Sequence, residues 1–177
     1  MIQHATHIRL FHYLLSDNGI FPNSAFPVLF YKSAFHLSHD HAPKIIEDAF
    51  QKNHWTNAWR NGIFTYHHYH STAHEVLGIY SGDCHIQLGG ERGIQLMAEK
   101  GDAILIPAGV AHKNIGSSLD FKCVGAYDRG KDFDINLGKS GDRPQTDKNI
   151  SRLPFPTLDP VLGKEGGLHA LWEKSSS

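Results

Sequence analysis

The chain has 177 residues, which is the usual length of one domain that can bury a hydrophobic core. Its formal net charge of -1 excludes the polycationic surface on which most nucleic-acid-binding proteins depend. The sequence has no apolar run long enough to span a membrane, and its N-terminus lacks the pattern of a signal peptide, so we expect a cytoplasmic protein without nucleic-acid or membrane partners.

The first 60 residues mix signals for strands with signals for one helix. Residues 8–15 and 26–35 are rich in aromatic and branched apolar side chains and are flanked by turn residues, which predicts two strands. Residues 38–53 have apolar side chains at helical spacing, and Ser38 or Asp40 precedes them as an N-cap. We therefore expect one short helix in the N-terminal part.

Beyond this helix the pattern changes to short strands divided by glycine turns. Trp55 and Trp59 lie four positions apart, which still favours a packing face on a helix. From Gly62 onward we expect strands at residues 64–70, 75–81, 84–89, 94–99, 103–108, 111–115 and 120–127. Closely spaced strands without intervening helices indicate an antiparallel sandwich or barrel.

The last part of the chain, residues 128–174, is rich in proline and glycine and contains scattered apolar side chains. This composition predicts an extended arm packed on the barrel rather than a free linker. The charged residues at 128–134 either reach over the mouth of the barrel or, as is usual for such a run, face solvent. We expect one domain over residues 1–174, with its core barrel at 62–127.

The stretch HHYHSTAHE contains four histidines and a glutamate in nine positions. On a strand, side chains two positions apart face the same way, so His68 and His70 point together. A turn at STA would return the chain beside that strand and bring Glu75 to the same place. A second tight turn, in PAGVAH, places His112 at the start of another strand. We expect these four side chains to converge on one metal ion inside the barrel.

This spacing resembles the first sequence motif of the cupin superfamily. The motif G-x5-H-x-H-x4-E-x6-G is matched in every spacing by Gly62, His68, His70, Glu75 and Gly82. The segments YHSTAHEVLG, PAGVAHKN and GAYDRGKDFD resemble those of the YjlB-like branch of small bacterial single-domain cupins. The resemblance covers residues 62–127 directly.

The second cupin motif, G-x5-P-x-G-x2-H-x3-N, is matched from Gly101 to His112. Its asparagine is displaced, because Gly116 occupies the expected position and the nearest asparagine is Asn114. This departure leaves the metal ligand in place. The resemblance implies an all-β fold of the cupin type, a double-stranded β-helix or jelly-roll barrel, that holds one divalent ion by three histidines and a glutamate.

Several neighbouring residues are candidates for the same site. His74 competes with Glu75 as a ligand, and we favour Glu75 because only its spacing matches the motif. Strand parity puts Phe64 and Tyr66 on the ligand face, where they would line a pocket or form part of the barrel core. By the same parity Asn114 would support the site beside His112.

Three neutral imidazoles and one carboxylate leave a divalent ion with a net charge of about +1 and two open positions at octahedral coordination. We expect Fe or Mn, then Ni, then Zn, because Zn tends to close such a set into a tetrahedron. The function that follows is a metal-dependent enzyme of the dioxygenase or the isomerase or lyase type, acting on a small polar substrate. The alternative is a non-catalytic module that binds a metal ion and a small ligand.

Large parts of the chain lie outside the two motifs and contain apolar residues that need to be covered. Cupins commonly pair, so the resemblance favours a homodimer in which the N-terminal strands or the C-terminal arm form the interface. The alternative is that these segments cover their own barrel.

Overall fold

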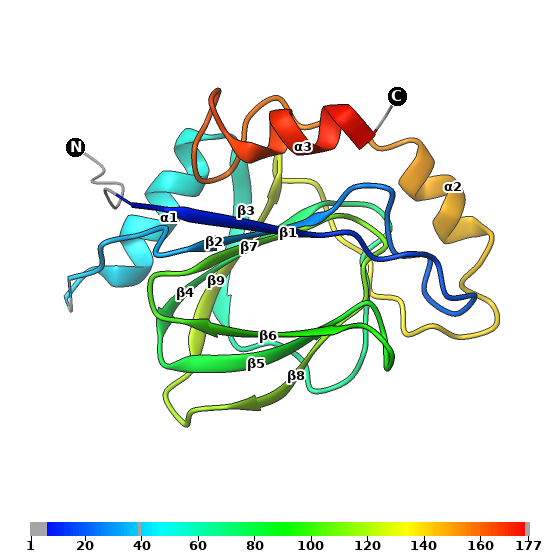
Figure 1. The fold of residues 1–177 in the computed structure, drawn as a ribbon, viewed down its shortest axis with the longest axis horizontal. Helices are drawn as coiled ribbons and strands as arrows, with labels where there is room; N and C mark the ends of the chain where they lie inside the picture. Colours follow the sequence, from blue (N-terminus) through cyan, green and yellow to red (C-terminus); the bar gives the residue numbers. More distant parts are fainter. Residues whose placement is uncertain (1–6, 39, 176–177) are drawn as a thin grey trace.

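The computed structural model describes residues 7–38 and 40–175, and in them a six-stranded sheet faces a three-stranded sheet (Figure 1). The strand orders are β1-β2-β7-β4-β9-β3 and β6-β5-β8. The strands are β1 (Arg9–Tyr13), β2 (Val28–Lys32), β3 (Trp55–Asn61), β4 (Glu75–Ser81), β5 (Asp83–Leu88), β6 (Ile94–Glu99), β7 (Ala103–Ile106), β8 (His112–Ser117) and β9 (Lys122–Asp128). The helices are α1 (Ala42–Lys52), α2 (Gln145–Ser151) and α3 (Gly167–Ser175).

All the pairings between these strands are antiparallel, and they are nested along the chain. Strand β4 pairs with β7 and β9, while β5 pairs with β6 and β8. This nested pairing is typical of a jelly roll. The all-β jelly-roll fold that the sequence predicts is therefore confirmed.

Most of the predicted strands are confirmed, with one exception that matters for the site. Strands β1 and β2 and the six strands from β4 to β9 lie where the sequence predicts them. The segment 64–70 forms no strand, because His68 makes a single bridge to His112 whereas Tyr69 makes one to Asn136. Since the partner changes from one residue to the next, no ladder of successive pairs develops.

The prediction that Trp55 and Trp59 share a helical face is wrong, because both lie on β3. The pairing of β3 with β9 shifts by one residue between Thr56 and Trp59, and Asn57 has a φ of 57°. On a regular strand, residues four apart share a face, but one extra residue reverses the face. Trp55 consequently packs beneath the helices, whereas Trp59 packs between the two sheets.

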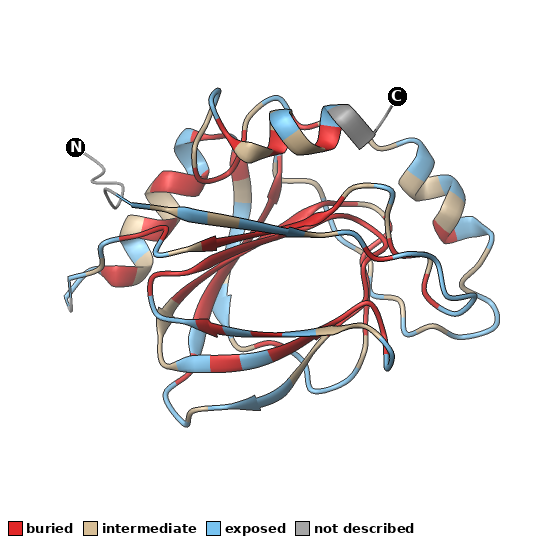
Figure 2. Cartoon of the chain, viewed as in Figure 1, coloured by how far each residue is buried: buried red, intermediate tan, exposed pale blue. Residues whose placement is uncertain are grey.

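Two hydrophobic clusters lie on opposite faces of the six-stranded sheet, as the alternation along β4 shows. Leu77 belongs to the cluster between the sheets, whereas Val76 belongs to the outer cluster, beneath α1 and the C-terminal arm. Helix α1 approaches closely, because a Cβ atom added at Gly78 would lie 2.6 Å from Cγ2 of Ile46. Figure 2 shows the strands in the middle of the fold as largely buried.

Helix α1 is confirmed, but its predicted N-cap is wrong. The helix begins at Ala42 with His41 as the N-cap residue, and no side chain bonds the free amides there. Pro43 lies in the first turn, which a helix tolerates because the amides of that turn have no helical partner. Proline thus sets the start of the helix, in place of Ser38 or Asp40.

The arm at 128–174 packs on the barrel as expected, but it contains the two helices α2 and α3, which the sequence did not indicate. The buried carboxylate of Asp159 organises the arm: it accepts hydrogen bonds from Tyr31 Oη at 2.6 Å and from the amides of Val161 and Leu168. The indole of Trp172 donates to Pro27 O at 2.9 Å. None of the helices in the described residues is long and apolar enough to cross a membrane.

Candidate metal centre

The four residues that the sequence predicts as ligands lie together between the sheets. His68 and His70 come from the segment before β4, Glu75 opens β4 and His112 opens β8. All four are buried, with exposed fractions of 4%, 5%, 3% and 1% for His68, His70, Glu75 and His112. The three histidines offer ligand atoms that lie within 4.8 Å of one another. Three buried histidines in this arrangement could bind a metal ion.

Each of these imidazoles is oriented by a backbone carbonyl group at Nδ1. His68 Nδ1 lies 3.1 Å from Tyr66 O, and His112 Nδ1 lies 3.0 Å from Val110 O. His70 Nδ1 makes a short contact with Asp134 O. A carbonyl oxygen only accepts, so Nδ1 carries the proton in each ring, and the Nε2 of a neutral ring retains a lone pair. A hydrogen bond from Nδ1 to a carbonyl group is typical of histidines that bind a metal through Nε2.

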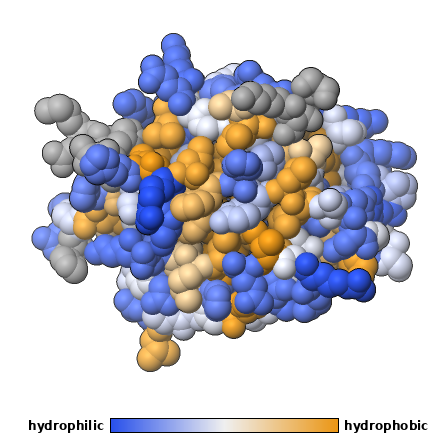
Figure 3. Space-filling model, in the orientation of Figure 1, coloured by the Kyte–Doolittle hydropathy of each residue, from blue (hydrophilic) through white to orange (hydrophobic). Residues whose placement is uncertain are grey.

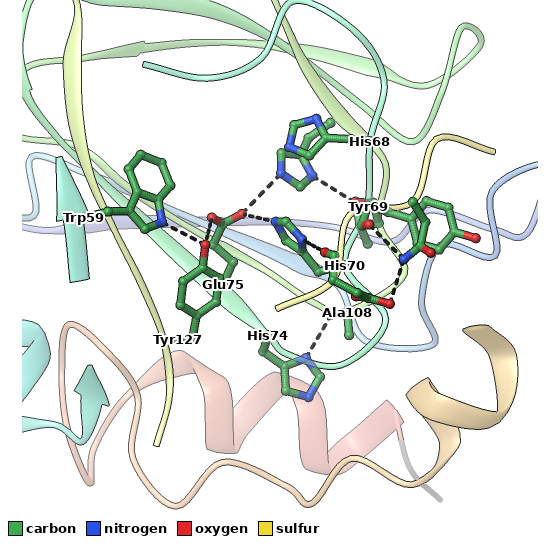
Figure 4. Close-up of polar contacts among 12 residues, drawn as sticks. Trp59, His68, Tyr69, His70, His74, Glu75, Ala108 and Tyr127 are labelled. Carbon is green, nitrogen blue, oxygen red and sulfur yellow. Dashed lines mark hydrogen bonds and ion pairs between the residues drawn. The ribbon is translucent and has the colours of Figure 1, made fainter. Parts of the chain in front are cut away.

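The two carboxylate oxygens of Glu75 face different groups (Figure 4). Its Oε1 accepts a hydrogen bond from Tyr127 Oη at 3.1 Å, and Tyr127 Oη accepts one from Trp59 Nε1 at 2.7 Å. Its Oε2 is buried and accepts no hydrogen bond from any described residue, although it lies 3.2 Å from Nε2 of both His70 and His112. A buried carboxylate oxygen that faces two imidazole nitrogens needs a cation, so this donor set fits a divalent metal ion.

The electrostatics of His68, His70 and Glu75 agree with this fit. Burial, together with neighbouring His112, lowers the pKa of His68 to about 3, which keeps that ring neutral. Burial alone would raise the pKa of Glu75, but the charge of His70 and the contact with His112 outweigh it and hold that pKa well below its usual range. Burial opposes a proton on His70, yet Glu75 raises the pKa of His70 above its ordinary value. A metal ion would therefore displace a proton from this pair.

Asp134 supports the ligand loop, although the sequence placed it in a charged run that usually faces solvent. Its carboxylate accepts hydrogen bonds from Ser71 N at 2.6 Å, from Thr72 N at 3.2 Å and from Asn136 Nδ2 at 2.9 Å. Its backbone carbonyl orients His70. Asp134 thus fixes both the loop that follows His70 and the ring of His70 itself.

Phe64 and Tyr66 lie beside His68, but they are not part of the barrel core. Their rings stack at 4.9 Å, and their centroids lie 5.0 Å and 5.9 Å from that of His68. They remain 45% and 47% exposed, respectively. Phe64 lines the cavity next to the site, whereas Tyr66 stacks on Phe64 and is not among the residues that line the cavity.

His74 and Asn114 lie away from the cluster. The Nδ1 of His74 accepts a hydrogen bond from Ala108 N at 2.9 Å (Figure 4). The ring of His74 packs edge-on against Trp172. Burial lowers the pKa of His74 to about 3. The side chain of Asn114 is occupied by Gly116 N at 2.8 Å and by Ser117 Oγ at 3.0 Å. Neither side chain contacts the three clustered histidines.

A cavity of about 360 Å³ opens next to the four predicted ligands. Its walls include three aromatic residues that the sequence reasoning did not identify: Trp59, Tyr127 and Phe133. Trp59 was assigned to a helix, and Phe133 lies in the arm, more than sixty positions from the histidine pair along the chain. The match of GAYDRGKDFD to the family was the one signal that could have pointed to Tyr127 and Phe133.

Comparisons with known proteins identify one curated relative of nearly the same length. The chain is 38% identical over 163 residues to the uncharacterized protein YjlB of Bacillus subtilis. The aligned region covers 92% of this chain and 96% of YjlB. No protein-family model matches the chain.

Similar solved structures are more distant. Procruciferin, an 11S globulin from Brassica napus, is 15% identical with a TM-score of 0.37, over 64% of this chain and 23% of the globulin. A DUF861 family protein from Thermotoga maritima is 21% identical with a TM-score of 0.32, over 46% of this chain and 85% of that protein. A salicylate 1,2-dioxygenase from Pseudaminobacter salicylatoxidans is 15% identical with a TM-score of 0.34, over 76% of this chain and 32% of the enzyme.

Proposed function

The chain belongs to the YjlB-like family of cupin proteins, and we propose that it is a metal-dependent enzyme acting on a small molecule that binds through oxygen atoms. The observation that carries this proposal is the position of the donor set. Three imidazole Nε2 atoms and the free oxygen of Glu75 converge at the wall of a cavity of about 360 Å³. A structural ion is usually enclosed by its ligands, whereas an ion held here would face the cavity.

His68, His70, Glu75 and His112 would hold the ion. A divalent ion supplies Lewis acidity toward the oxygen atoms of a substrate, and a redox-active one also supplies reactivity with dioxygen. Fe or Mn remains our expectation ahead of Ni and Zn. The ligand types alone do not select the metal, so the reconstitution experiment described below compares the four candidates.

The other residues of the site orient the metal-binding groups and pack around them. The hydroxyl of Tyr127 holds Oε1 of Glu75, which directs Oε2 toward the imidazoles. The stacked rings of Phe64 and Tyr66 cover the outer side of His68. Together these contacts keep the donor set oriented, with the cavity as the open side.

Metal reconstitution followed by a substrate screen tests the proposal. The purified protein is stripped with a chelator, reloaded with Fe²⁺, Mn²⁺, Ni²⁺ or Zn²⁺, and incubated with catechols, keto acids and sugars, with and without dioxygen. We expect product, detected by mass spectrometry, from at least one loaded form and none from the stripped protein. Turnover that needs dioxygen identifies a dioxygenase, whereas anaerobic turnover identifies an isomerase or lyase.

His70→Ala and His67→Ala provide a matched pair of variants for this screen. His70 belongs to the donor set, whereas His67 lies on the other side of its segment, with Nε2 3.0 Å from Glu91 Oε1. Turnover should be lost in the first variant and retained in the second. Ligand binding in calorimetry without product under any condition would contradict the enzyme and favour the non-catalytic alternative.

A further inference from the structure

The cavity beside the metal centre has aromatic walls. Tyr127 and Phe133 stack with their ring centroids 4.6 Å apart and an angle of 17° between the rings. Phe133 also packs edge-on against the ring of His70, at 5.2 Å. Trp59 and Phe64 complete the aromatic lining. Flat apolar ligands pack well against such rings in stacked or edge-on geometry.

Trp59 is held in this lining by three local features. The irregular pairing after Thr56 turns the side chain to the inside of the sheet. The indole lies directly on the backbone of Gly125, where an added Cβ atom would be 2.2 Å from Cε2 of the ring. The indole nitrogen then donates to Tyr127 Oη (Figure 4). A side chain restrained in this way forms a fixed wall that a ligand need not order on binding.

The charges around the cavity favour a ligand with one negative charge. Among the described residues that line it, Arg60 is the one basic side chain other than the histidines, and its guanidinium group pairs with Glu47 at 2.6 and 2.8 Å. Glu75 is the one acidic side chain in the lining. A divalent ion on three neutral histidines and Glu75 would carry a net charge of about +1. Among the described residues, this lining offers no further free cation to neutralise a second anionic group.

The size of the cavity also restricts the ligand. At about 360 Å³ it lies near the lower end of the range for small-molecule sites, which is roughly 300–1,000 Å³. A sugar would need many hydrogen-bonding partners, and aromatic rings do not provide them. Among the polar side chains that line the cavity, Asn61 already accepts a hydrogen bond at Oδ1 from the amide of Gly62 at 2.8 Å.

We propose that the natural ligand is a small aromatic monoanion that binds the metal ion through oxygen atoms and packs its ring between Trp59, Phe64 and Phe133. This inference rests on the proposed metal-dependent function and narrows its substrate class. It replaces the general polar substrate that the sequence predicts with one whose polarity is confined to the end that faces the ion.

Two chelating probes with the same oxygen donors test the proposal. Acetohydroxamate carries a methyl group where benzohydroxamate carries a phenyl ring, so the difference in affinity reports on the aromatic walls. Both probes are titrated into protein loaded with Mn²⁺ and into stripped protein, by calorimetry, and the metal retained by the protein is measured after each titration. We expect benzohydroxamate to bind the loaded protein at least about tenfold more tightly than acetohydroxamate.

Phe133→Ala and Phe64→Ala should each reduce this preference while leaving the affinity for acetohydroxamate within about twofold. Phe11→Ala is the matched control, because Phe11 is 41% exposed, similar to 39% for Phe133 and 45% for Phe64, and does not line the cavity. This control should keep the full preference for the phenyl ring. Melting temperatures and retained Mn²⁺ show that each variant is folded and loaded.

The possible failures are distinguishable. Protein that retains none of Mn²⁺, Fe²⁺, Ni²⁺ and Zn²⁺ contradicts the proposed metal-dependent function itself, and if it retains one of these other than Mn²⁺, both probes are titrated into that loaded form. Loaded protein that binds the two hydroxamates equally within twofold overturns the aromatic ligand while leaving the metal site intact. A preference for the phenyl ring that survives both Phe133→Ala and Phe64→Ala would also overturn it, because the ring would then bind elsewhere.

Discussion

Replacing Tyr127 with phenylalanine removes one hydroxyl group from the contacts behind the metal centre. This hydroxyl donates to Oε1 of Glu75 at 3.1 Å and accepts from the indole of Trp59 at 2.7 Å. The ring itself remains, so its stacking on Phe133 is preserved. The substitution therefore tests the orientation of Glu75 with little change of shape.

The expected loss is in metal affinity. Removing a group that orients a metal ligand typically weakens binding by about 10–100-fold, which is about 1.4–2.7 kcal/mol. The substitution also leaves Glu75 Oε1 and Trp59 Nε1 without this partner, so we expect Tyr127→Phe to lower the free energy of unfolding by about 1–3 kcal/mol.

Competition with a chromogenic chelator measures the affinity for Mn²⁺ or Zn²⁺, and urea unfolding of the stripped protein measures stability. Tyr31→Phe is the matched control, because Tyr31 is fully buried and donates to Asp159 at 2.6 Å, away from the metal centre. It should lose stability and keep its metal affinity. If Tyr127→Phe binds the metal as tightly as the unchanged protein, or Tyr31→Phe weakens binding equally, the orienting role of Tyr127 is refuted.

Three further predictions concern the rest of the molecule. Asp159→Asn turns one buried acceptor into a donor opposite Tyr31 and Leu168, so urea unfolding should show a loss of about 2–6 kcal/mol; a loss below 1 kcal/mol would contradict this. The pKa of His74 lies at about 3, below the ordinary 6.5, so its contribution to stability should be full above pH 6.5 and fall by about 2 kcal/mol at pH 5. The loss of stability between pH 7 and pH 5 should therefore be smaller by about this amount in His74→Gln, and an unchanged slope in that variant would exclude this origin. We also propose a homodimer, since apolar side chains gather on the face that carries β1 and β6 (Figure 3), where Phe11 and Met97 are 41% and 48% exposed. Light scattering at micromolar concentration should give the mass of two chains, and the mass of one chain would argue against the dimer.

The sequence predicted most reliably the features that depend on neighbouring residues. Strand β4 was located to the residue, because its apolar run is bounded by a turn before Glu75 and by Gly82 after it. The gathering of His68, His70, Glu75 and His112 could also be anticipated, because motif spacing and tight turns are local properties. Whether these residues bind a metal remains a prediction.

The features that the sequence did not reveal depend on contacts between distant segments. Trp59 has a helical spacing from Trp55, and only the register of β3 against β9 turns it into the cavity. The role of Asp134 depends on its hydrogen bonds to a loop 63 positions earlier in the chain. The residues next to Asp134 in the sequence give no indication of this contact. Helix α3 begins at Gly167, the second of two glycines, and its stability comes from burial of Leu168 and Trp172 against the sheet rather than from helix propensity.

The central claim, that four side chains hold one metal ion, is tested most directly by elemental analysis of the purified protein. The unchanged protein and His74→Ala should each contain close to one equivalent of a divalent metal, because the ring of His74 points away from the cluster. His70→Ala should lose most of that metal, because it removes one of three clustered imidazoles and the neighbour of Glu75 Oε2. Full metal content in His70→Ala, with loss instead in His74→Ala, would contradict the account.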